Sequence, residues 1–528
     1  MSIASTARRT VAVLAILGIL TPAARAADGR NDKEKAAIAV LRGAAPEADK
    51  ALACKQLAIH GSADALPDLA KLLGDARLAS WARIALEAIP GDEAGAALRA
   101  SAAGLSGDLL VGAINSLGVR RDAAALEVLS QRLRGDDAAA AEAAAVALGR
   151  LGTQAAASAL EAALPRASGA LESAVAEGLV LAAESALAAG KSAEAVRIYD
   201  LVRASGAPPQ RLLEATRGAI LARGDDGAGL LIEQLDSPEQ KTFRLGLTVA
   251  REVKAGKCDA ALVAQVAKLP APRAALLLRA LGDRRTPEAT AALVAAAAKG
   301  ARETRLVALE ALGGAGDASA IAVLLAGAED ADAELARAAT ASLSALSGAE
   351  VDAEIKKRLP QAKGKILPML LELVGQRRID AIPPALAAVE SQDAATRAAA
   401  LAALGNIVDV ERLPVLVKAA TAPRDAADAA NARKALLTAA IRMPDREACA
   451  GAIAGPLAAA PADARDVLLE ALGQVGGTKA LAAVDVRERF AALSVEPRTN
   501  TPEQFRALVE SDLARWAKVV RDAGIKSE

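Results

Sequence analysis

The amino-acid sequence predicts an all-α solenoid of short helical hairpins. Apolar residues make up 53% of the 528 residues but aromatic residues only 1%, and the excess is mostly Ala with Leu and Val. Ala is the best helix former, and its small side chain lets helix axes approach closely. A chain of this length exceeds one compact core, and a sequence motif returns after 31 residues, from Leu117 to Leu148. Together these observations favour stacked helices over a sheet or a single globule.

The beginning of the chain, residues 1–26, has the three parts of an export signal. Arg8 and the arginine after it supply positive charge, residues 11–20 are apolar, and residues 24–26 read Ala-Arg-Ala, an A-x-A cleavage motif. We expect cleavage after Ala26 and a periplasmic or secreted protein, by either the general secretory or the twin-arginine route. The apolar run is about half of the ~20 residues that a membrane span needs, so no stable membrane insertion is expected after cleavage.

A motif of apolar residue, any residue, Ala or Ser, Leu and Gly marks the repeats. It ends at Gly118, Gly149, Gly282, Gly313, Gly405 and Gly473, and Gly375 occupies one of the gaps. We interpret each glycine as the left-handed residue that ends a helix. The polar residues Asp122, Thr153 and Asp317 follow in the turns, where a side-chain oxygen caps the next helix. These signals predict repeats over 27–183 and 241–484.

Two helices in about 31 residues cannot bury their apolar faces alone, so neighbouring hairpins must stack on one another. This pattern resembles the HEAT repeat, in particular the short bacterial form found in phycobilisome-lyase-like proteins. The resemblance implies a solenoid with a groove, and it specifies architecture more than function.

The segment 184–240 departs from the pattern. Residues 188–199, from Ala188 to Tyr199, are similar to a tetratricopeptide helix pair, and Pro208-Pro209 follows. We therefore predict an irregular joint between the two repeat regions.

The last segment, 485–528, has a different texture. Thr501-Pro502-Glu503-Gln504 is a complete helix start with a capping box, and an apolar face follows that includes Phe505 and Trp516. The segment resembles the C-terminal end of tripartite tricarboxylate transporter substrate-binding proteins. That family binds its ligand between α/β lobes, which have no counterpart upstream here. We interpret the tail as a remnant or fusion whose helix packs on the last repeat.

The composition contains little catalytic chemistry. His60 is the only histidine, and we expect it at a helix end and not in a metal site. Lys and Arg together number 64 and Asp and Glu also 64, so a nucleic-acid partner is not expected. Cys54, Cys258 and Cys449 lie about six repeats apart, and we expect buried free thiols and no disulfides. We predict no enzyme activity, no catalytic residue, no metal and no cofactor.

Four residues are candidates for a partner surface: Trp81, Arg83, Arg120 and Arg121. Trp and Arg dominate the energetics of many protein interfaces. The alternative is that Trp81 fills the core and the arginines pair with neighbouring acidic residues. A further series, Arg305, Arg397, Arg433 and Arg465, either lines a groove or forms ion pairs between repeats, and we favour the ion pairs.

The sequence thus favours a non-catalytic extracytoplasmic scaffold that presents a solenoid groove to a protein or peptide partner. One alternative is a lyase-type or chromophore-handling HEAT protein, against which the scarcity of aromatic residues argues. The other is a remnant or fusion of a transporter substrate-binding protein, against which the missing lobes argue.

Overall fold

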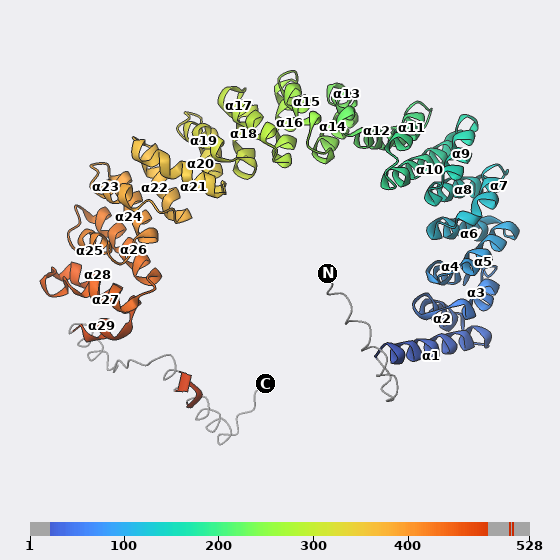
Figure 1. Ribbon diagram of the computed structural model, residues 1–528, viewed down its shortest axis with the longest axis horizontal. Helices are drawn as coiled ribbons and strands as arrows, with labels where there is room; N and C mark the ends of the chain where they lie inside the picture. The colour runs from blue at the N-terminus through green and yellow to red at the C-terminus, as the bar shows by residue number, and fades with distance from the viewer. Residues whose placement is uncertain (1–21, 484–505, 508, 512–528) are drawn as a thin grey trace, which may run out of the picture. The chain divides into compact units, whose positions relative to one another are not determined.

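The computed structural model describes residues 22–483, 506–507 and 509–511 (Figure 1). All regular secondary structure in these ranges is helical, so the predicted all-α solenoid is confirmed. Most of the predicted export signal and nearly all of the predicted tail lie outside the described residues, as does the packing of that tail on the last repeat.

The chain forms two compact units, residues 1–265 and 266–528. The helices of the first unit are α1 Pro22–Arg42, α2 Glu47–His60, α3 Leu66–Leu72, α4 Ala79–Ala88, α5 Asp92–Gly104, α6 Gly107–Arg120, α7 Leu126–Leu133, α8 Ala138–Leu151, α9 Gln154–Ala163, α10 Gly169–Ala188, α11 Ser192–Arg203, α12 Pro209–Arg223, α13 Ala228–Asp236 and α14 Gln240–Glu252, and α15 Lys257–Val266 ends it. Those of the second unit are α16 Ala271–Arg284, α17 Pro287–Lys299, α18 Arg302–Ala315, α19 Ile321–Ala328, α20 Ala333–Ala345, α21 Ala349–Arg358, α22 Ile366–Arg377, α23 Ile382–Val389, α24 Ala394–Ile407, α25 Pro414–Thr421, α26 Ala426–Arg442, α27 Arg446–Ala454, α28 Ala462–Val475 and α29 Gly477–Ala482.

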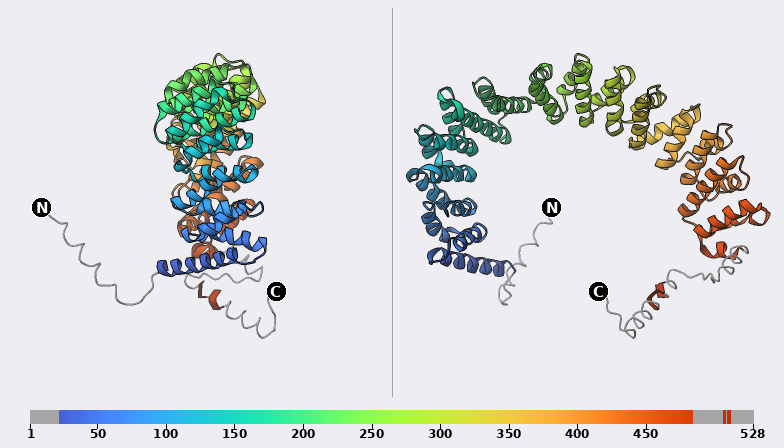
Figure 2. Two further views of the ribbon diagram at one scale, coloured as in Figure 1. Left: turned by 90° about the vertical axis from the view of Figure 1, so that its right-hand side faces the viewer. Right: turned by 180° about the vertical axis from the view of Figure 1, so that it is seen from behind.

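Within each unit the helices form two layers. In the first unit the even-numbered helices α2 to α12 each pack on the next even-numbered helix, and on the other side α1, α3, α5 and α7 each pack on the next odd-numbered helix. The hairpins that begin at α1 are stacked one on another in Figure 2. The second unit repeats this arrangement in α16 to α20 and again in α22 to α28. We call the two sides the even layer and the odd layer.

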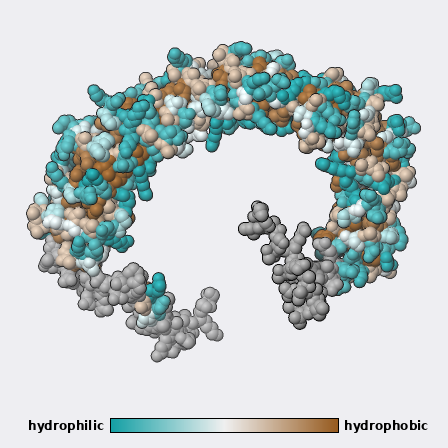
Figure 3. Space-filling model, in the orientation of Figure 1, coloured by the Kyte–Doolittle hydropathy of each residue, from teal (hydrophilic) through white to brown (hydrophobic). Residues whose placement is uncertain are grey.

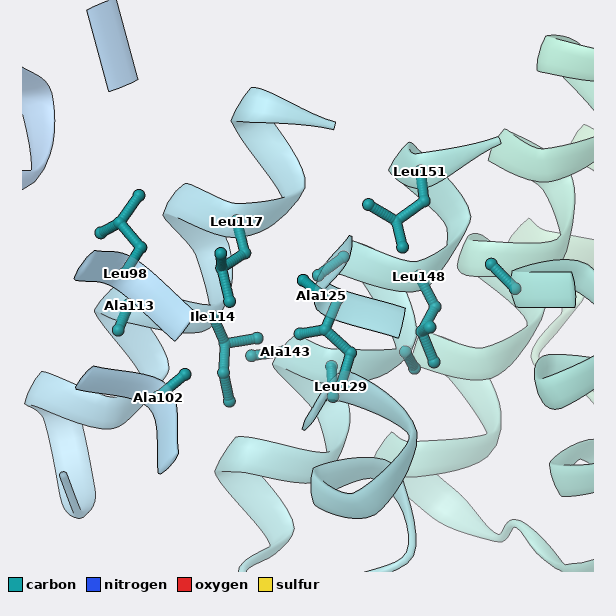
Figure 4. Close-up of a cluster of buried hydrophobic side chains, with 14 of the residues drawn as sticks. Leu98, Ala102, Ala113, Ile114, Leu117, Ala125, Leu129, Ala143, Leu148 and Leu151 are labelled. Carbon is teal, nitrogen blue, oxygen red and sulfur yellow. The ribbon is translucent and has the colours of Figure 1, made fainter. Parts of the chain in front are cut away.

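The core lies between the layers and is built from Ala and Leu. Leu98, Ile114, Leu129 and Leu148 are fully buried, and Figure 4 shows their side chains gathered from α5, α6, α7 and α8. Because each hairpin contributes one side of such a cluster, its apolar faces are buried only when a neighbour is present.

The predicted helix caps are confirmed. The Oδ1 atom of Asp122 accepts from the Ala124 N–H at 3.1 Å, Thr153 Oγ1 from Ala156 at 3.3 Å and Asp317 Oδ1 from Ser319 at 2.8 Å. Thr153 starts an α-helix directly, whereas the two aspartates start short 3-10 turns, Ala123–Ala125 and Ala318–Ala320.

The interpretation of the motif glycines as helix ends is wrong. Each motif glycine lies inside a helix, and that helix continues for two more residues. This holds for Gly118, Gly149, Gly282, Gly313, Gly375, Gly405 and Gly473. The left-handed residues that end four of these helices are Arg121, Gly152, Arg285 and Arg378.

Close helix packing explains the glycines instead. A Cβ atom on Gly118 would lie 2.9 Å from the Cα of Ala147 in the next even helix, and one on Gly375 would lie 2.9 Å from the Cα of Ala403. Real Cβ atoms do not approach backbone so closely, so any side chain here would push the helices apart. The exception is Gly473 on α28, which has no neighbour within 4 Å among the described residues.

The predicted joint, 184–240, contains regular helices. Helix α11 packs on both α10 and α12, and the buried ring of Tyr199 fills the space in front of Gly218. The domain boundaries given by the sequence stay predictions.

The prediction for the cysteines is confirmed, because Cys54, Cys258 and Cys449 form no disulfide and are buried in α2, α15 and α27. None of the helices in the described part of the chain combines the length and the apolar character that a membrane crossing requires.

Candidate interaction surface

Large apolar side chains are exposed together at the N-terminal end of the even layer. Leu52 and Ile59 on α2 are 56% and 59% exposed, Trp81 and Ile84 on α4 are 40% and 48% exposed, and Val119 on α6 is 53% exposed. Helix α4 packs against both α2 and α6, so the five side chains belong to adjacent helices. We call these five residues the N-terminal face. Figure 3 shows apolar surface between hydrophilic residues over this end of the first unit.

The spacing of these residues explains why they share a side of their helices. Trp81 and Ile84 are one helical turn apart, and Leu52 and Ile59 are two turns apart. Their neighbours Cys54, Leu57 and Leu86 point into the core and are fully buried. Helices α2 and α4 therefore each have a second apolar stripe that the fold does not cover.

Arg83, the second predicted residue, lies on α4 between Trp81 and Ile84. Its guanidinium occupies the space that a Cβ on Gly112 of α6 would fill, and the residue is half-buried. Burial lowers the pKa of Arg83, and the nearby charge of Glu87 opposes this effect. Within the described chain Arg83 has no ion-pair or hydrogen-bond partner. The carboxylate of Glu87 instead accepts a hydrogen bond from Ser116 Oγ at 2.6 Å.

Arg120, the third predicted residue, is used inside the fold. Its Nη1 atom donates to the carbonyl of Ile89 at 2.6 Å and its Nη2 atom to that of Gly91 at 2.7 Å, and it also reaches the carbonyls of Leu86 and Glu87. These carbonyls lie in the last turn of α4 or just after it, where helix geometry leaves carbonyls without partners. Arg120 therefore has a structural role, capping α4 from α6, but its partners are backbone carbonyls and not the acidic residues that the structural alternative predicted.

Arg121, the fourth, is exposed and ends α6 in the left-handed region with φ of 52°. A residue with a Cβ is strained there, and glycine is the usual occupant. Arg121 follows Val119 by two positions in the sequence.

Three arginines of the later series, Arg305, Arg397 and Arg433, form ion pairs between repeats, as favoured by the sequence. Arg305 pairs with Asp330 at 2.5 Å, Arg397 with Asp428 at 2.9 Å and Arg433 with Glu470 at 2.6 Å.

Similar pairs connect neighbouring helices of the even layer away from the N-terminal face. Arg211 on α12 pairs with Glu177 on α10, Arg217 on α12 pairs with Glu252 on α14 at 2.8 Å, and Arg279 on α16 pairs with Glu310 on α18 at 3.3 Å. Arg83 faces α6 in the same manner but meets a glycine instead of an acidic residue. The sequence did not show this difference, because it depends on which residue of α6 lies opposite.

The thiols and the histidine lie in environments that suit structural roles. Burial raises the pKa of Cys54 to about 11 and that of Cys449 to about 11, opposite to the change that activates a thiol. His60 is the last residue of α2, at a helix end as predicted. The described residues contain no group of three or more His, Cys, Asp or Glu arranged to hold a metal ion.

The fold is therefore that of a HEAT-like helical solenoid with an exposed apolar surface at one end. Solved structures with a similar arrangement include yeast importin-beta, Kap95p, at 13% identity over 92% of this chain and 76% of that chain, with a TM-score of 0.36. Importin beta in a polyethylene glycol condition is 11% identical over 90% of this chain and 78% of that chain, with a TM-score of 0.37. Kap121p bound to Nup53p is 14% identical over 93% of this chain and 66% of that chain, with a TM-score of 0.33.

No protein-family model matches the chain. No curated protein matches it either. The resemblances to phycobilisome-lyase-like repeats and to the transporter proteins stay predictions.

Proposed function

We propose that the protein is a non-catalytic scaffold that binds a protein or peptide through the N-terminal face, in the periplasm or outside the cell. The observation that carries this proposal is the exposure of five large apolar side chains, Trp81 among them, on three adjacent helices. Contiguous exposed apolar surface on a soluble protein marks an interaction site, and Trp is among the residues that contribute most to binding.

The face is held in place before any partner arrives. Arg120 ties α6 to the end of α4, and the Ser116–Glu87 hydrogen bond joins the same two helices. A preorganised surface loses little conformational entropy on binding, so more of the apolar contact appears as affinity. Helical repeats suit this role because adjacent hairpins hold one another rigidly.

A binding role also fits the state of the reactive side chains. The raised pKa values of Cys54 and Cys449 keep both thiols protonated at neutral pH. Of the three aromatic residues that the structure describes, Tyr199 and Phe243 are buried and Trp81 alone is exposed. A flat chromophore would therefore find a single aromatic ring on this part of the molecule, which makes the chromophore-handling alternative the weaker candidate.

Site-specific photocrosslinking tests the proposal. A benzoylphenylalanine placed at Ile84 on the N-terminal face is compared in cells with one at Ala100, an exposed residue of α5 in the odd layer. We expect a discrete crosslinked partner at Ile84 and none at Ala100. The identified partner, once purified, should bind the wild-type chain and lose about tenfold or more in affinity with Trp81→Ala. Equal crosslinking from both positions, or an unchanged affinity, would contradict the proposal.

The location is tested separately by cell fractionation and mass spectrometry. We expect the protein in the periplasm or the medium with Ala27 as its first residue, because cleavage is predicted after Ala26. A cytoplasmic protein that retains residues 1–26 would contradict the extracytoplasmic part of the proposal.

A further inference from the structure

The environment of Arg83 identifies the kind of partner that the N-terminal face suits. Its guanidinium lies between α4 and α6, on the helix that also carries the exposed residues Trp81 and Ile84. A guanidinium has five N–H donors and is always charged in proteins. Partly removing it from water costs free energy that an anion placed against it recovers.

The fold makes room for Arg83 but supplies no ion-pair or hydrogen-bond partner among the described residues. Gly112 is buried in α6, and any side chain there would displace the guanidinium. Elsewhere in the even layer Arg211, Arg217 and Arg279 have an acidic partner on the neighbouring helix. The carboxylate of Glu87, whose charge acts on Arg83, makes no ion pair with it and accepts from Ser116 instead. Arg83 thus faces the neighbouring helix as the arginine of an inter-repeat ion pair does, but it meets Gly112 and not an acidic residue.

We propose that the missing acid comes from the partner, which presents an Asp or Glu flanked by apolar side chains to the N-terminal face. This inference rests on the proposed function. The carboxylate pairs with Arg83, and the flanking apolar groups cover Trp81, Ile84 and Val119. Arg suits a carboxylate because its planar fork donates two parallel hydrogen bonds. A surrounding ring of apolar contacts excludes water from the pair and strengthens it.

An acidic peptide fits this site better than an anionic membrane does. Attraction to anionic lipids takes a cluster of Lys and Arg residues, whereas the site offers one arginine within an apolar surface. The chain as a whole carries equal numbers of basic and acidic residues, 64 of each.

Three matched peptides test the inference. Each is a synthetic amphipathic helix with Leu on one face, and the central residue between the leucines is Glu, Gln or Lys. Binding to the full chain is followed by the fluorescence of Trp81, in a Trp516→Phe background that leaves it as the only tryptophan. We expect the Glu peptide to bind about tenfold or more tightly than the Gln peptide and the Lys peptide to bind most weakly.

Two variants tie this preference to Arg83. Arg83→Gln should reduce the difference between the Glu and Gln peptides to about twofold or less. Gly112→Ala should do the same, because the new methyl group displaces the guanidinium while leaving Arg83 in the sequence. Arg134→Gln, at an exposed arginine that follows α7 in the odd layer, is the matched control and should leave the preference unchanged. Circular dichroism checks that every variant keeps its helical content.

The outcomes separate this inference from the proposed function. If the three peptides bind equally and Trp81→Ala abolishes binding, the face is a binding surface and the acidic inference is wrong. If the Glu preference survives Arg83→Gln, or if none of the peptides binds, the inference is also wrong. Co-sedimentation with phosphatidylglycerol vesicles that depends on Arg83, without any peptide preference, would overturn it in favour of a membrane. The photocrosslinking at Ile84 decides the proposed function independently of these results.

Discussion

Gly149 of α8 and Gly178 of α10 lie directly against each other where the two helices cross. A Cβ on Gly149 would overlap the backbone of Gly178, and a Cβ on Gly178 would overlap that of Ala145. This contact lets two helices of the even layer approach as closely as backbones allow. The glycine of the repeat motif is therefore a packing residue.

Substitution at this crossing should destabilise the first unit. Gly149→Ala inserts a methyl group where backbone already lies, and we expect a loss of about 1–3 kcal/mol. Alanine favours helix over glycine by about 1 kcal/mol, so the observed loss is the balance of the two effects. Gly473→Ala is the control, because the space around Gly473 is open, and it should gain about 0.5–1 kcal/mol. Urea unfolding followed by circular dichroism measures both. Equal changes in the free energy of unfolding, in the same direction for both variants, would contradict the packing role of Gly149.

Substitutions at the consecutive residues Arg120 and Arg121 should change the stability of the protein in opposite directions. Arg120→Met leaves several carbonyls at the end of α4 without a donor, and we expect a loss of about 1–3 kcal/mol. Arg121→Gly relieves a left-handed residue with φ of 52°, and we expect a gain of up to about 1 kcal/mol. Thermal unfolding compares the pair, and hydrogen exchange at the end of α4 should rise only in Arg120→Met. Destabilisation by Arg121→Gly would show that its side chain has a structural role.

The ion pair between Arg397 and Asp428 should be intolerant of single changes. Both residues are 7% exposed, and their side chains are joined at 2.9 Å. Arg397→Met leaves the Asp428 carboxylate buried without its partner, and we expect a loss of about 3–5 kcal/mol. The double variant Arg397→Met/Asp428→Leu removes both charges and should recover most of that loss. Denaturant unfolding of the single and double variants tests this. Additive losses would mean that the pair is not coupled.

The contact between α1 and α3 should weaken at acid pH. Asp68 in α3 is 5% exposed, and its carboxylate accepts from Arg42 Nε at 2.9 Å and from Lys71 Nζ at 3.1 Å. The hydrogen bond from Arg42 holds the pKa of Asp68 below its usual value of 3.8. A carboxyl group whose pKa is lower in the folded state contributes stability above its unfolded pKa, and this contribution disappears as the pH falls through the folded pKa.

Asp68→Asn should therefore destabilise the protein at neutral pH by about 1 kcal/mol. The difference from wild type should shrink once the pH falls below 3.8, where the unfolded carboxyl takes up its proton. Thermal unfolding of both proteins between pH 7 and acid pH measures the difference. A gap that stays constant over this range would show that the charge of Asp68 contributes nothing.

The three thiols should be inert in the folded protein. Burial raises the pKa of Cys54 and of Cys449 to about 11, and Cys258 is buried as well. Only the thiolate reacts with iodoacetamide, so we expect no labelling at pH 8 in native conditions and labelling of all three in urea. Mass spectrometry counts the modified residues. Rapid native labelling of any one would show that its helix opens locally.

Local patterns in the sequence were sufficient for much of the fold. The scarcity of aromatic residues and the 31-residue spacing from Leu117 to Leu148 identified the solenoid. The caps at Asp122, Thr153 and Asp317 follow from chemistry between residues two or three positions apart. The pairing of Arg305, Arg397 and Arg433 was also predicted, because charged side chains between stacked helices need partners.

The candidate surface was predicted less completely. Trp81 and the adjacent Arg83 were identified by residue type, but the members of the N-terminal face besides Trp81, such as Leu52 and Val119, look like core residues in the sequence. An apolar residue on a helix is buried or exposed according to which neighbour covers it, and that neighbour is in another repeat.

The sequence by itself determined the helices, their caps and the repeating order of hairpins, because those depend on propensities and contacts within a few residues. Only the tertiary structure decided that the motif glycines let helices of adjacent repeats pack closely, that Arg120 caps α4, and that Arg83 lies over Gly112 without an ion-pair partner in the described chain. The reason is that each of these relationships joins residues about thirty positions apart, whose mutual orientation is set by how the hairpins stack.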